Sequence, residues 1–213
     1  MKKRVAFIGS GELSLSIAHY MIEDNQYEVV GFFDDYTPIN TDVKGYKIIG
    51  KLDDIESMHK DNIFDGLVNG VGFMRMEYRK EVFDRFKGIV PFVNFFHSSC
   101  IIDSTATVGE GVIIFPMSML YYNAIIEDNV FIQVNTTVTD SLVCKDTMVS
   151  GGVMIAGRST VGQGCNIGVK TCISSDVKIC AGVRTGAATT IVKDITEPGT
   201  YVGVPAKKIK DSI

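Results

Sequence analysis

Aliphatic side chains recur at every sixth position through the second half of the chain. The first series of these positions comprises Ile102, Val108, Ile114, Leu120, Ile126, Ile132 and Val138. The second series comprises Val143, Val149, Ile155, Val161, Ile167, Ile173, Ile179, Thr185 and Ile191, in which only Thr185 is not aliphatic. Gly, Asn, Asp, Thr and Ser are frequent between these positions. The combination is typical of a parallel β-helix, in which each sixth side chain is buried inside a narrow prism.

One step of this ladder is irregular. Val138 and Val143 are five positions apart (143 − 138), whereas the other neighbouring members are six apart. One residue is therefore missing between them. We expect the turn that contains Asp140 to differ in shape from the other turns.

Short apolar runs alternate with amphipathic segments in the first half of the chain. The predicted strands fall at 4–8, 27–33, 64–72 and 90–96. The predicted helices follow the glycine turn at 9–11 and cover 75–87. This order of elements indicates a small Rossmann-like α/β sheet, too short for a two-lobed dinucleotide domain, so a mononucleotide fits it better than NAD does. We expect two domains, residues 1–97 and residues 98–213.

The first predicted strand is followed by a glycine turn that enters a helix, an arrangement that can cradle a phosphate group. Gly9 and Gly11 lack a Cβ, so the backbone can approach an anion at the helix N-terminus. Ser14 replaces the third glycine of the dinucleotide fingerprint. Asp34 lies 23 residues beyond Gly11 (34 − 11), about where such folds have the acid that binds ribose, and Asp35 follows it. A plain βαβ unit with a solvated acidic strand end would leave the same pattern.

Two arginines of the segment 75–87 follow a loop that contains glycine. Arg75 and Arg79 could reach a phosphate group bound at that loop. The alternative is that both are solvated charges on the surface of the helix.

Charge and hydropathy exclude several classes of partner. The chain has 21 Lys plus Arg against 25 Asp plus Glu, a net charge of −4, and no basic stripe, so nucleic acid is not expected. No apolar run approaches the roughly 20 residues that a membrane span requires. Glycines and Glu12 interrupt the apolar N-terminal stretch, which excludes a secretion signal. We therefore expect a soluble, cytoplasmic protein with no membrane partner.

The cysteines and histidines give no sign of a metal site. Five cysteines form no CxxC pair, and an odd number without a secretion signal indicates free thiols that pack as small apolar residues. The histidines all precede the ladder; they are His19, His59 and His97. A zinc-dependent β-helix enzyme would need several histidines within the repeats, so no metal is predicted.

Several motifs together resemble the sialic-acid and bacillosamine type sugar O- and N-acetyltransferases. They are GSGELS at 9–14, GFFDD at 31–35, FFHSS at 95–99, the hexad ladder, TIVKDI at 190–195 and YVGVPAKKI at 201–209. The resemblance implies a nucleotide-binding domain joined to a left-handed hexapeptide β-helix. It further implies a homotrimer that holds acyl-CoA between neighbouring β-helices and a nucleotide-linked amino sugar at the N-terminal domain.

The resemblance also assigns residues to the two substrates. The residues that would hold the nucleotide sugar are Gly9, Ser10, Gly11, Asp34, Asp35, Arg79 and Gln133. The residues that match stretches contacting CoA are Ala156, Gly157, Gly186, Ala187, Ala206, Lys207 and Lys208. The two lysines suit the phosphates of acetyl-CoA, although loose surface lysines are the alternative.

The chain departs from the family at the irregular step. Asp140 stands where the family has its catalytic histidine, and Gln133 stands where it has an asparagine. An alignment shifted by one residue puts Thr139 in that place, and Ser141 replaces the acid that orients the imidazole. We therefore expect a remodelled catalytic site with Asp140 or Thr139. Asp140 could instead cap a turn, because Asp is a common turn residue.

An amine acceptor tolerates the loss of the histidine better than a hydroxyl does. An amine with a pKa near that of an α-amino group, about 7.7 to 8.0, is partly neutral at pH 7. We therefore expect transfer of an acetyl group from acetyl-CoA to the amino group of a nucleotide-linked 4-amino-4,6-dideoxy sugar. A non-catalytic trimeric scaffold that binds a nucleotide sugar, O-acetylation and transfer of another acyl group stay open, as do the nucleotide base and the sugar stereochemistry. His97 either joins the two domains or approaches the site in an assembly.

Overall fold

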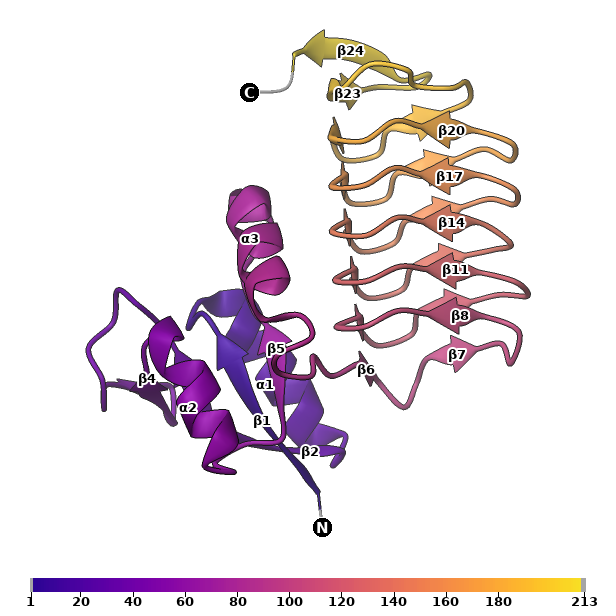
Figure 1. Ribbon diagram of the computed structural model, residues 1–213. Helices are drawn as coiled ribbons and strands as arrows, with labels where there is room; N and C mark the ends of the chain where they lie inside the picture. Colours follow the sequence, from indigo (N-terminus) through magenta and orange to yellow (C-terminus); the bar gives the residue numbers. More distant parts are fainter. Residues whose placement is uncertain (1, 212–213) are drawn as a thin grey trace. The chain divides into compact units, whose positions relative to one another are not determined.

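The computed structural model of the protein describes residues 2–211 (Figure 1). The chain forms two compact units that divide between Asn94 and Phe95. No helix among the described residues is long and apolar enough to cross a membrane.

The first unit is a five-stranded sheet with helices, as the alternation of elements predicts. Its strands are β1 (Lys3–Ile8), β2 (Tyr27–Phe33), β3 (Asp42–Val43), β4 (Tyr46–Gly50) and β5 (Gly66–Asn69). Its helices are α1 (Glu12–Glu23), α2 (Ile55–Lys60) and α3 (Met76–Phe86), with short 3-10 turns at Leu52–Asp54 and Phe73–Arg75. The strand order is β3-β4-β2-β1-β5, and only the β3–β4 pair is antiparallel. The carboxyl ends of β1, β2 and β5 therefore meet at one edge, where α/β sheets bind ligands.

Helix α1 packs because its apolar positions repeat with helical spacing. Ser14, Ile17, Ala18 and Met21 are buried, which is the i, i+3, i+4, i+7 pattern of one helix face. The hairpin of β3 and β4 was not predicted from the sequence. Lys44 and Gly45 both have positive φ at its two-residue turn, so the dipeptide carries the local signal for it.

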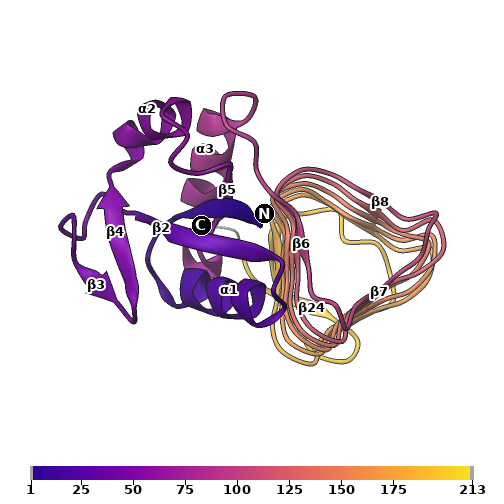
Figure 2. The ribbon, with the colours of Figure 1, turned by 90° about the horizontal axis from the view of Figure 1, so that it is seen from below.

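The second unit is a left-handed parallel β-helix, which confirms the predicted fold class. We name its three faces A, B and C, each a stack of short strands (Figure 2). Face A comprises β7 (Ile101–Ile102), β10 (Met119–Leu120), β13 (Thr137–Val138), β16 (Met154–Ile155), β19 (Cys172–Ile173) and β22 (Thr190–Ile191). Face B comprises β8 (Thr107–Val108), β11 (Ile125–Ile126), β14 (Leu142–Val143), β17 (Thr160–Val161) and β20 (Lys178–Ile179). Face C comprises β6 (Phe95–Phe96), β9 (Ile113–Ile114), β12 (Phe131–Ile132), β15 (Met148–Val149), β18 (Asn166–Ile167), β21 (Val183–Thr185), β23 (Gly199–Val202) and the antiparallel β24 (Lys207–Lys210).

The hexad ladder forms the core of this unit. Leu120, Ile126, Ile132 and the later aliphatic members are at most 3% exposed and line the inside of the prism. Only the first two members, Ile102 and Val108, are half-buried, because they lie in the first coil. Figure 2 shows the coils superimposed in a triangular outline, as a repeat of three hexads per coil requires.

The predicted fourth strand, 90–96, is divided between the two units. Phe92 forms an isolated bridge with Leu67 of β5 in the first unit. Phe95 and Phe96 form β6, which pairs with β9 of the β-helix. The boundary therefore lies three residues before the predicted one at 97, because the apolar run contributes backbone hydrogen bonds to both sheets.

Candidate active site

A cavity of about 190 Å³ lies at the edge where β1, β2 and β5 end. It is lined by Ile8, Gly9, Ser10, Gly11, Phe33, Asp34, Asp35, Tyr36, Leu52, Gly70, Val71, Gly72, Arg75 and Tyr78. Five of the predicted nucleotide-binding residues are thus brought together. Gly9 has a φ of +86°, which an L side chain rarely adopts, and a Cβ on Gly11 would meet nothing within 4 Å. Gly11 caps α1 without a side-chain hydrogen bond, so this helix end is open to an anion.

The replacement of the third fingerprint glycine by Ser14 is compensated on the facing loop. The Ser14 hydroxyl donates a hydrogen bond of 2.6 Å to the Gly9 carbonyl. A Cβ on Gly70 would lie 1.8 Å from the Ser14 Oγ. Close packing between the two segments therefore requires a glycine at position 70 instead of at position 14.

Asp34 is fully engaged in holding the cavity wall. Its Oδ2 accepts hydrogen bonds from the Ser10 backbone N–H (3.1 Å) and the Ser10 hydroxyl (2.6 Å). Its Oδ1 accepts from the backbone N–H groups of Tyr36 (2.9 Å) and Thr37 (3.0 Å). Partial burial raises the pKa of Asp34, but these hydrogen bonds outweigh that effect and lower it. A carboxylate has about four acceptor positions, so Asp34 is a structural anchor and the exposed Asp35 is the freer of the two acids.

Arg79 does not line the cavity. It is completely buried, and its Nη1 donates hydrogen bonds to the carbonyl oxygens of Asn69 (2.8 Å) and Val71 (3.0 Å). The prediction that Arg79 contacts the nucleotide is therefore corrected, because its guanidinium holds the loop behind the cavity. Arg75 does line the cavity, and its guanidinium carbon lies 5.6 Å from the centre of the Tyr36 ring.

The irregular step of the ladder forms a three-residue turn at the corner between faces A and B, which we call the A–B corner. The Ser141 N–H donates a 2.6 Å hydrogen bond to the Thr139 carbonyl across Asp140. The turns 121–124, 156–159 and 174–177 at the same corner have four residues, one of which has positive φ: Asn123, Arg158 or Asp176. The registers across the step confirm the loss of one residue, because Leu120 pairs with Val138 18 positions later (138 − 120) and Ile126 with Val143 17 later (143 − 126). The missing residue is the one with positive φ.

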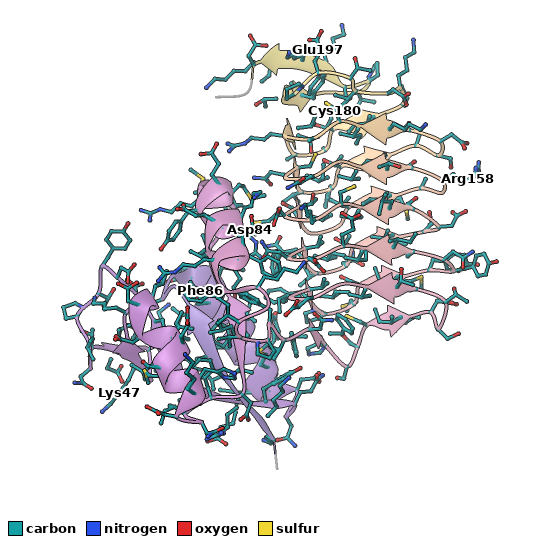
Figure 3. The ribbon with its side chains drawn as sticks, in the orientation of Figure 1. Lys47, Asp84, Phe86, Arg158, Cys180 and Glu197 are labelled. Carbon is teal, nitrogen blue, oxygen red and sulfur yellow. The ribbon has the colours of Figure 1, made fainter. Side chains whose placement is uncertain are left out.

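Asp140 lies in this turn directly over a glycine of the next coil. A Cβ on Gly157 would lie 2.2 Å from the Asp140 Oδ1, so the glycine makes room for the carboxylate. The Arg158 N–H donates a 2.9 Å hydrogen bond to the Asp140 carbonyl. Arg158 itself points outward from the β-helix (Figure 3). Its guanidinium donates two hydrogen bonds of 2.7 Å to Asp176.

The carboxylate of Asp140 differs from the other carboxylates along the A–B corner. Asp103 accepts hydrogen bonds from Thr105, and Asp176 accepts from Arg158. Asp194 accepts from the Lys178 N–H. Within residues 2–211, no group donates a hydrogen bond to the half-buried carboxylate of Asp140.

The other residues predicted near Asp140 have different places. The Thr139 hydroxyl donates a 3.0 Å hydrogen bond to the Ile155 carbonyl. Gln133 lies at the corner between faces C and A, the C–A corner, where its Oε1 accepts from the Gly151 N–H at 3.0 Å. His97 lies at the C–A corner of the first coil, and its Nδ1 is bonded to Ser99. The structure therefore does not bring Gln133 or His97 to Asp140 within one chain.

The residues assigned to CoA fall on both borders of face A and at the end of the β-helix. Ala156 and Gly157 lie on the A–B corner, and Gly186 and Ala187 lie on the C–A corner. A cavity of about 350 Å³ lies at the last coil, lined by Ile191, Val192, Lys193, Asp194, Ile195, Tyr201, Pro205, Ala206 and Lys207.

Lys208 is held by acids of its own chain. Its Nζ lies 2.9 Å from Asp211 and 3.1 Å from Glu197, and both contacts raise its pKa. Lys207 and Lys193 are thus the lysines of this cavity, and Lys193 was not among the predicted residues.

The cysteines are free thiols with raised pKa values where burial is deepest. Burial raises the pKa of Cys165 to about 12, so its thiol stays protonated at neutral pH. Across residues 2–211, His, Cys, Asp and Glu side chains form no group of three that could hold a metal ion.

Three solved structures share the fold of nearly the whole chain. The acetyltransferase domain of PglB from Neisseria gonorrhoeae FA1090 has a TM-score of 0.89 at 24% identity, with 98% of this chain and 100% of that chain covered. That domain has also been solved with acetyl coenzyme A. PerB from Caulobacter crescentus, in complex with CoA and GDP-perosamine, has a TM-score of 0.87 at 21% identity, with 96% of each chain covered. WeeI from Acinetobacter baumannii AYE has a TM-score of 0.79 at 16% identity, with 96% and 99% covered.

A family model matches the first unit. Residues 4–86 match the PglD N-terminal domain. This stretch of the chain contains the glycine turn, Asp34 and Asp35. This match confirms the resemblance that the sequence motifs predict for the first unit, and the solved acetyltransferase structures share the fold of nearly the whole chain.

Proposed function

We propose that this protein is an acetyl-CoA-dependent N-acetyltransferase that acts on the amino group of a nucleotide-linked 4-amino-4,6-dideoxy sugar in surface glycan biosynthesis. The match to the PglD N-terminal domain supports a sugar substrate linked to a nucleotide. The similar structures solved with acetyl coenzyme A, and with CoA and GDP-perosamine, support the donor and the class of acceptor. We place the reaction in the cytoplasm, where acetyl-CoA and nucleotide sugars are made.

The observation that carries this proposal is the carboxylate of Asp140, which accepts no hydrogen bond from any group of residues 2–211. The shortened turn holds it at the border of face A, and the missing side chain of Gly157 leaves it room. The other aspartates of the A–B corner are used in hydrogen bonds within the protein. A half-buried acceptor without a donor is suited to bind an amine of the substrate.

The reaction needs only modest help from a side chain. The neutral amine attacks the thioester carbon, and a C–N bond forms as the carbonyl π electrons move to oxygen. Asp140 takes the proton that becomes acidic on the nitrogen of this tetrahedral adduct. The adduct then collapses, the C–S bond breaks, and the proton passes to the departing thiolate of CoA. Orientation and backbone N–H donors provide the remaining acceleration.

The absence of a histidine favours nitrogen over oxygen as the acceptor. No histidine follows His97 in the sequence. A general base contributes typically 10² to 10⁴-fold, or roughly 3 to 5 kcal/mol. A hydroxyl would need that base from the start, because its proton is much harder to remove than the proton of a protonated adduct.

Acetyl-CoA is proposed to lie along face A toward the last coil. Ala156 and Gly157 border this face on one side, and Gly186 and Ala187 border it on the other. Lys207, with Ala206 beside it, would meet the phosphates at the cavity of the last coil.

We further propose a homotrimer in which a second copy covers face A. Ile101 and Met154 on this face are 61% and 41% exposed, and Met117 on the adjoining C–A corner is 71% exposed. Exposed apolar side chains of this kind mark surfaces that associate. Light scattering coupled to size-exclusion chromatography tests the mass, and a monomer at micromolar concentration would contradict the trimer.

Substitution of Asp140 tests the catalytic proposal. Thiol release from acetyl-CoA would be followed for Asp140→Asn and Asp140→Ala with a panel of UDP-, dTDP- and GDP-linked amino sugars. We expect kcat/KM to fall by about 10² to 10⁴-fold. Asp176→Asn, an acid of the same corner that is paired with Arg158, is the matched control and is expected to stay within about threefold of the wild type. Unchanged kcat/KM in both Asp140 variants would remove this carboxylate from the mechanism.

The competing function is a trimeric scaffold that binds a nucleotide sugar without catalysis, and the absent histidine motivates it. No thiol release above background with any acceptor, combined with tight nucleotide-sugar binding, would favour the scaffold. Release with hydroxyl sugars or with longer acyl-CoA donors would instead identify O-acetylation or another acyl transfer.

A further inference from the structure

The turn that precedes Asp140 by one coil carries two exposed tyrosines. Tyr121 and Tyr122 are 56% and 54% exposed at the A–B corner. The Tyr121 N–H donates a 2.8 Å hydrogen bond to the Val138 carbonyl, so the turn 121–124 stacks directly on the turn 139–141. The tyrosines and Asp140 therefore lie in adjacent coils of the same corner.

The register identifies which tyrosine occupies the row of Asp140. Val138 pairs with Leu120 on one side and with Ile155 on the other. Counting two residues beyond each strand gives Tyr122, Asp140 and Gly157 as one row along the β-helix axis. Tyr121, Thr139 and Ala156 form the neighbouring row.

The missing residue shortens the A–B corner at the coil of Asp140. The preceding coil has Asn123 at the positive-φ position and the following coil has Arg158 there, whereas none of residues 139–141 has positive φ. The Arg158 guanidinium donates its two hydrogen bonds to Asp176, so its charge is engaged with the coil that comes after it. Gly157 adds no side chain to the row of Tyr122 and Asp140, and a Cβ there would lie 2.2 Å from the Asp140 Oδ1.

We propose that Tyr122 is the stacking platform for the sugar ring of the acceptor, with the sugar amine directed at Asp140. This inference rests on the proposed function. One face of a deoxy sugar is largely C–H, which packs well on an aromatic ring, while the tyrosine hydroxyl remains available to a sugar hydroxyl. Small-molecule sites commonly combine an aromatic side chain with a few polar groups, and the row of Tyr122 and Asp140 offers both.

Binding measurements separate the platform from catalysis. The dissociation constant of the full-length protein is measured by calorimetry for UDP-, dTDP- and GDP-linked 4-amino-4,6-dideoxy sugar and for each nucleoside diphosphate alone. The ratio between the two constants, taken for the nucleotide that binds best, isolates the contribution of the sugar. We expect Tyr122→Ala to reduce this ratio about tenfold and Tyr122→Phe to change it less than threefold, because the phenyl ring still stacks.

Tyr121→Ala is the matched control, since Tyr121 is equally exposed in the same turn but lies in the row of Thr139. It is expected to leave the ratio within about twofold of the wild type. An effect of Tyr121→Ala that equals or exceeds that of Tyr122→Ala would overturn the proposal, as would a wild-type ratio of one. A normal sugar contribution to binding without thiol release would support the platform while contradicting the proposed acetyl transfer, so the two failures are distinguishable.

Discussion

The N-terminal cavity and the short turn at Asp140 use their charged side chains in opposite ways. At the cavity, the Asp34 carboxylate accepts four hydrogen bonds and the Arg79 Nη1 behind it donates two to backbone carbonyls, so both side chains hold the loops of the wall. At the short turn, backbone geometry alone holds Asp140, and its carboxylate accepts no hydrogen bond from the part of the chain described here.

This difference teaches how each region can act on a substrate. A cavity whose charged side chains are hydrogen-bonded within the protein offers a fixed shape and backbone N–H groups, which suits the role in nucleotide binding proposed for it. A carboxylate that is positioned without being hydrogen-bonded is available to accept a proton or an amine N–H. In the proposed function, the first region recognises the substrate and the second performs the chemistry.

The largest effect is expected on the free energy of unfolding when the buried Arg79, which holds the loop behind the cavity, is replaced. Arg79→Met removes two hydrogen bonds from a guanidinium to carbonyls, and each such charged bond contributes about 1.5 to 3 kcal/mol. We expect the free energy of unfolding of the first unit to fall by about 3 kcal/mol or more. Chemical denaturation followed by circular dichroism measures the change.

Arg85→Met is the matched control on the same helix, because Arg85 pairs with Asp53 at an exposed position. It should cost at most about 1 kcal/mol. Equal losses in both variants would mean that Arg79 contributes no more than a surface charge.

Restoring the missing residue tests whether the short turn positions the Asp140 carboxylate. Insertion of Asn between Asp140 and Ser141 recreates a four-residue turn, and Asn adopts positive φ readily, as at Asn123. We expect an intact fold but a fall in kcat of about 10²-fold, because the carboxylate no longer has its present position. Steady-state kinetics and a thermal melt check the two statements.

Arg158→Asn places the same residue type at the positive-φ position of the next coil without changing the spacing, and it should retain activity. If the insertion variant stays fully active, the shape of the turn has no part in catalysis.

The ladder could be predicted because each inward position faces the same narrow interior, so every hexad repeats one requirement. The position of the defect at Val138 to Val143 was equally visible in the sequence. The state of the Asp140 carboxylate was not, because it depends on Gly157 in the next coil and on which donors lie nearby in three dimensions.

The errors in the first unit have a similar cause. Arg79 was expected either to reach a phosphate, because it follows the glycine-containing loop, or to be a solvated charge. Its burial depends on how the loop turns the carbonyls of Asn69 and Val71 toward it. Tyr36 and Tyr78 were missed as lining residues, although the convergence of parallel strand ends at one edge could have indicated their segments. Lys51 was missed as well, and its Nζ donates three hydrogen bonds of 2.9 Å to carbonyls of the loop after β2.

The pH dependence of stability sharpens the assignment of Asp34 as an anchor. Because its pKa is lowered in the folded state, the ionised form stabilises the protein above the ordinary pKa of about 3.9. That stabilisation is lost as the pH falls through the lower, folded-state pKa. We expect Asp34→Asn to reduce stability at pH 7 by about 1 to 2 kcal/mol. The difference from the wild type should shrink below about pH 4.

Urea denaturation between pH 3 and pH 7 measures this difference. Asp42→Asn is the control, because Asp42 accepts a single hydrogen bond from Gly45 in an exposed hairpin. A difference between Asp34→Asn and the wild type that is constant down to pH 3 would show that the charge of Asp34 does not anchor the wall.

The smallest expected effect extends the comparison to the two adjacent lysines at the last coil. Lys207 lines the cavity there, whereas the charge of Lys208 is already paired with Glu197 and Asp211 of its own chain. An exposed lysine that meets a phosphate contributes up to about 1 kcal/mol, so Lys207→Ala should raise the KM for acetyl-CoA about threefold to fivefold. Lys208→Ala should change it less than twofold.

The effect of Lys207→Ala should also diminish in 0.5 M salt, since exposed charges are screened. An equal rise in KM for both variants at low salt would mean that ion pairs within the chain do not decide which lysine binds acetyl-CoA. The distinction between charges that anchor the structure and charges that are available to a substrate would then hold only for the N-terminal cavity and Asp140.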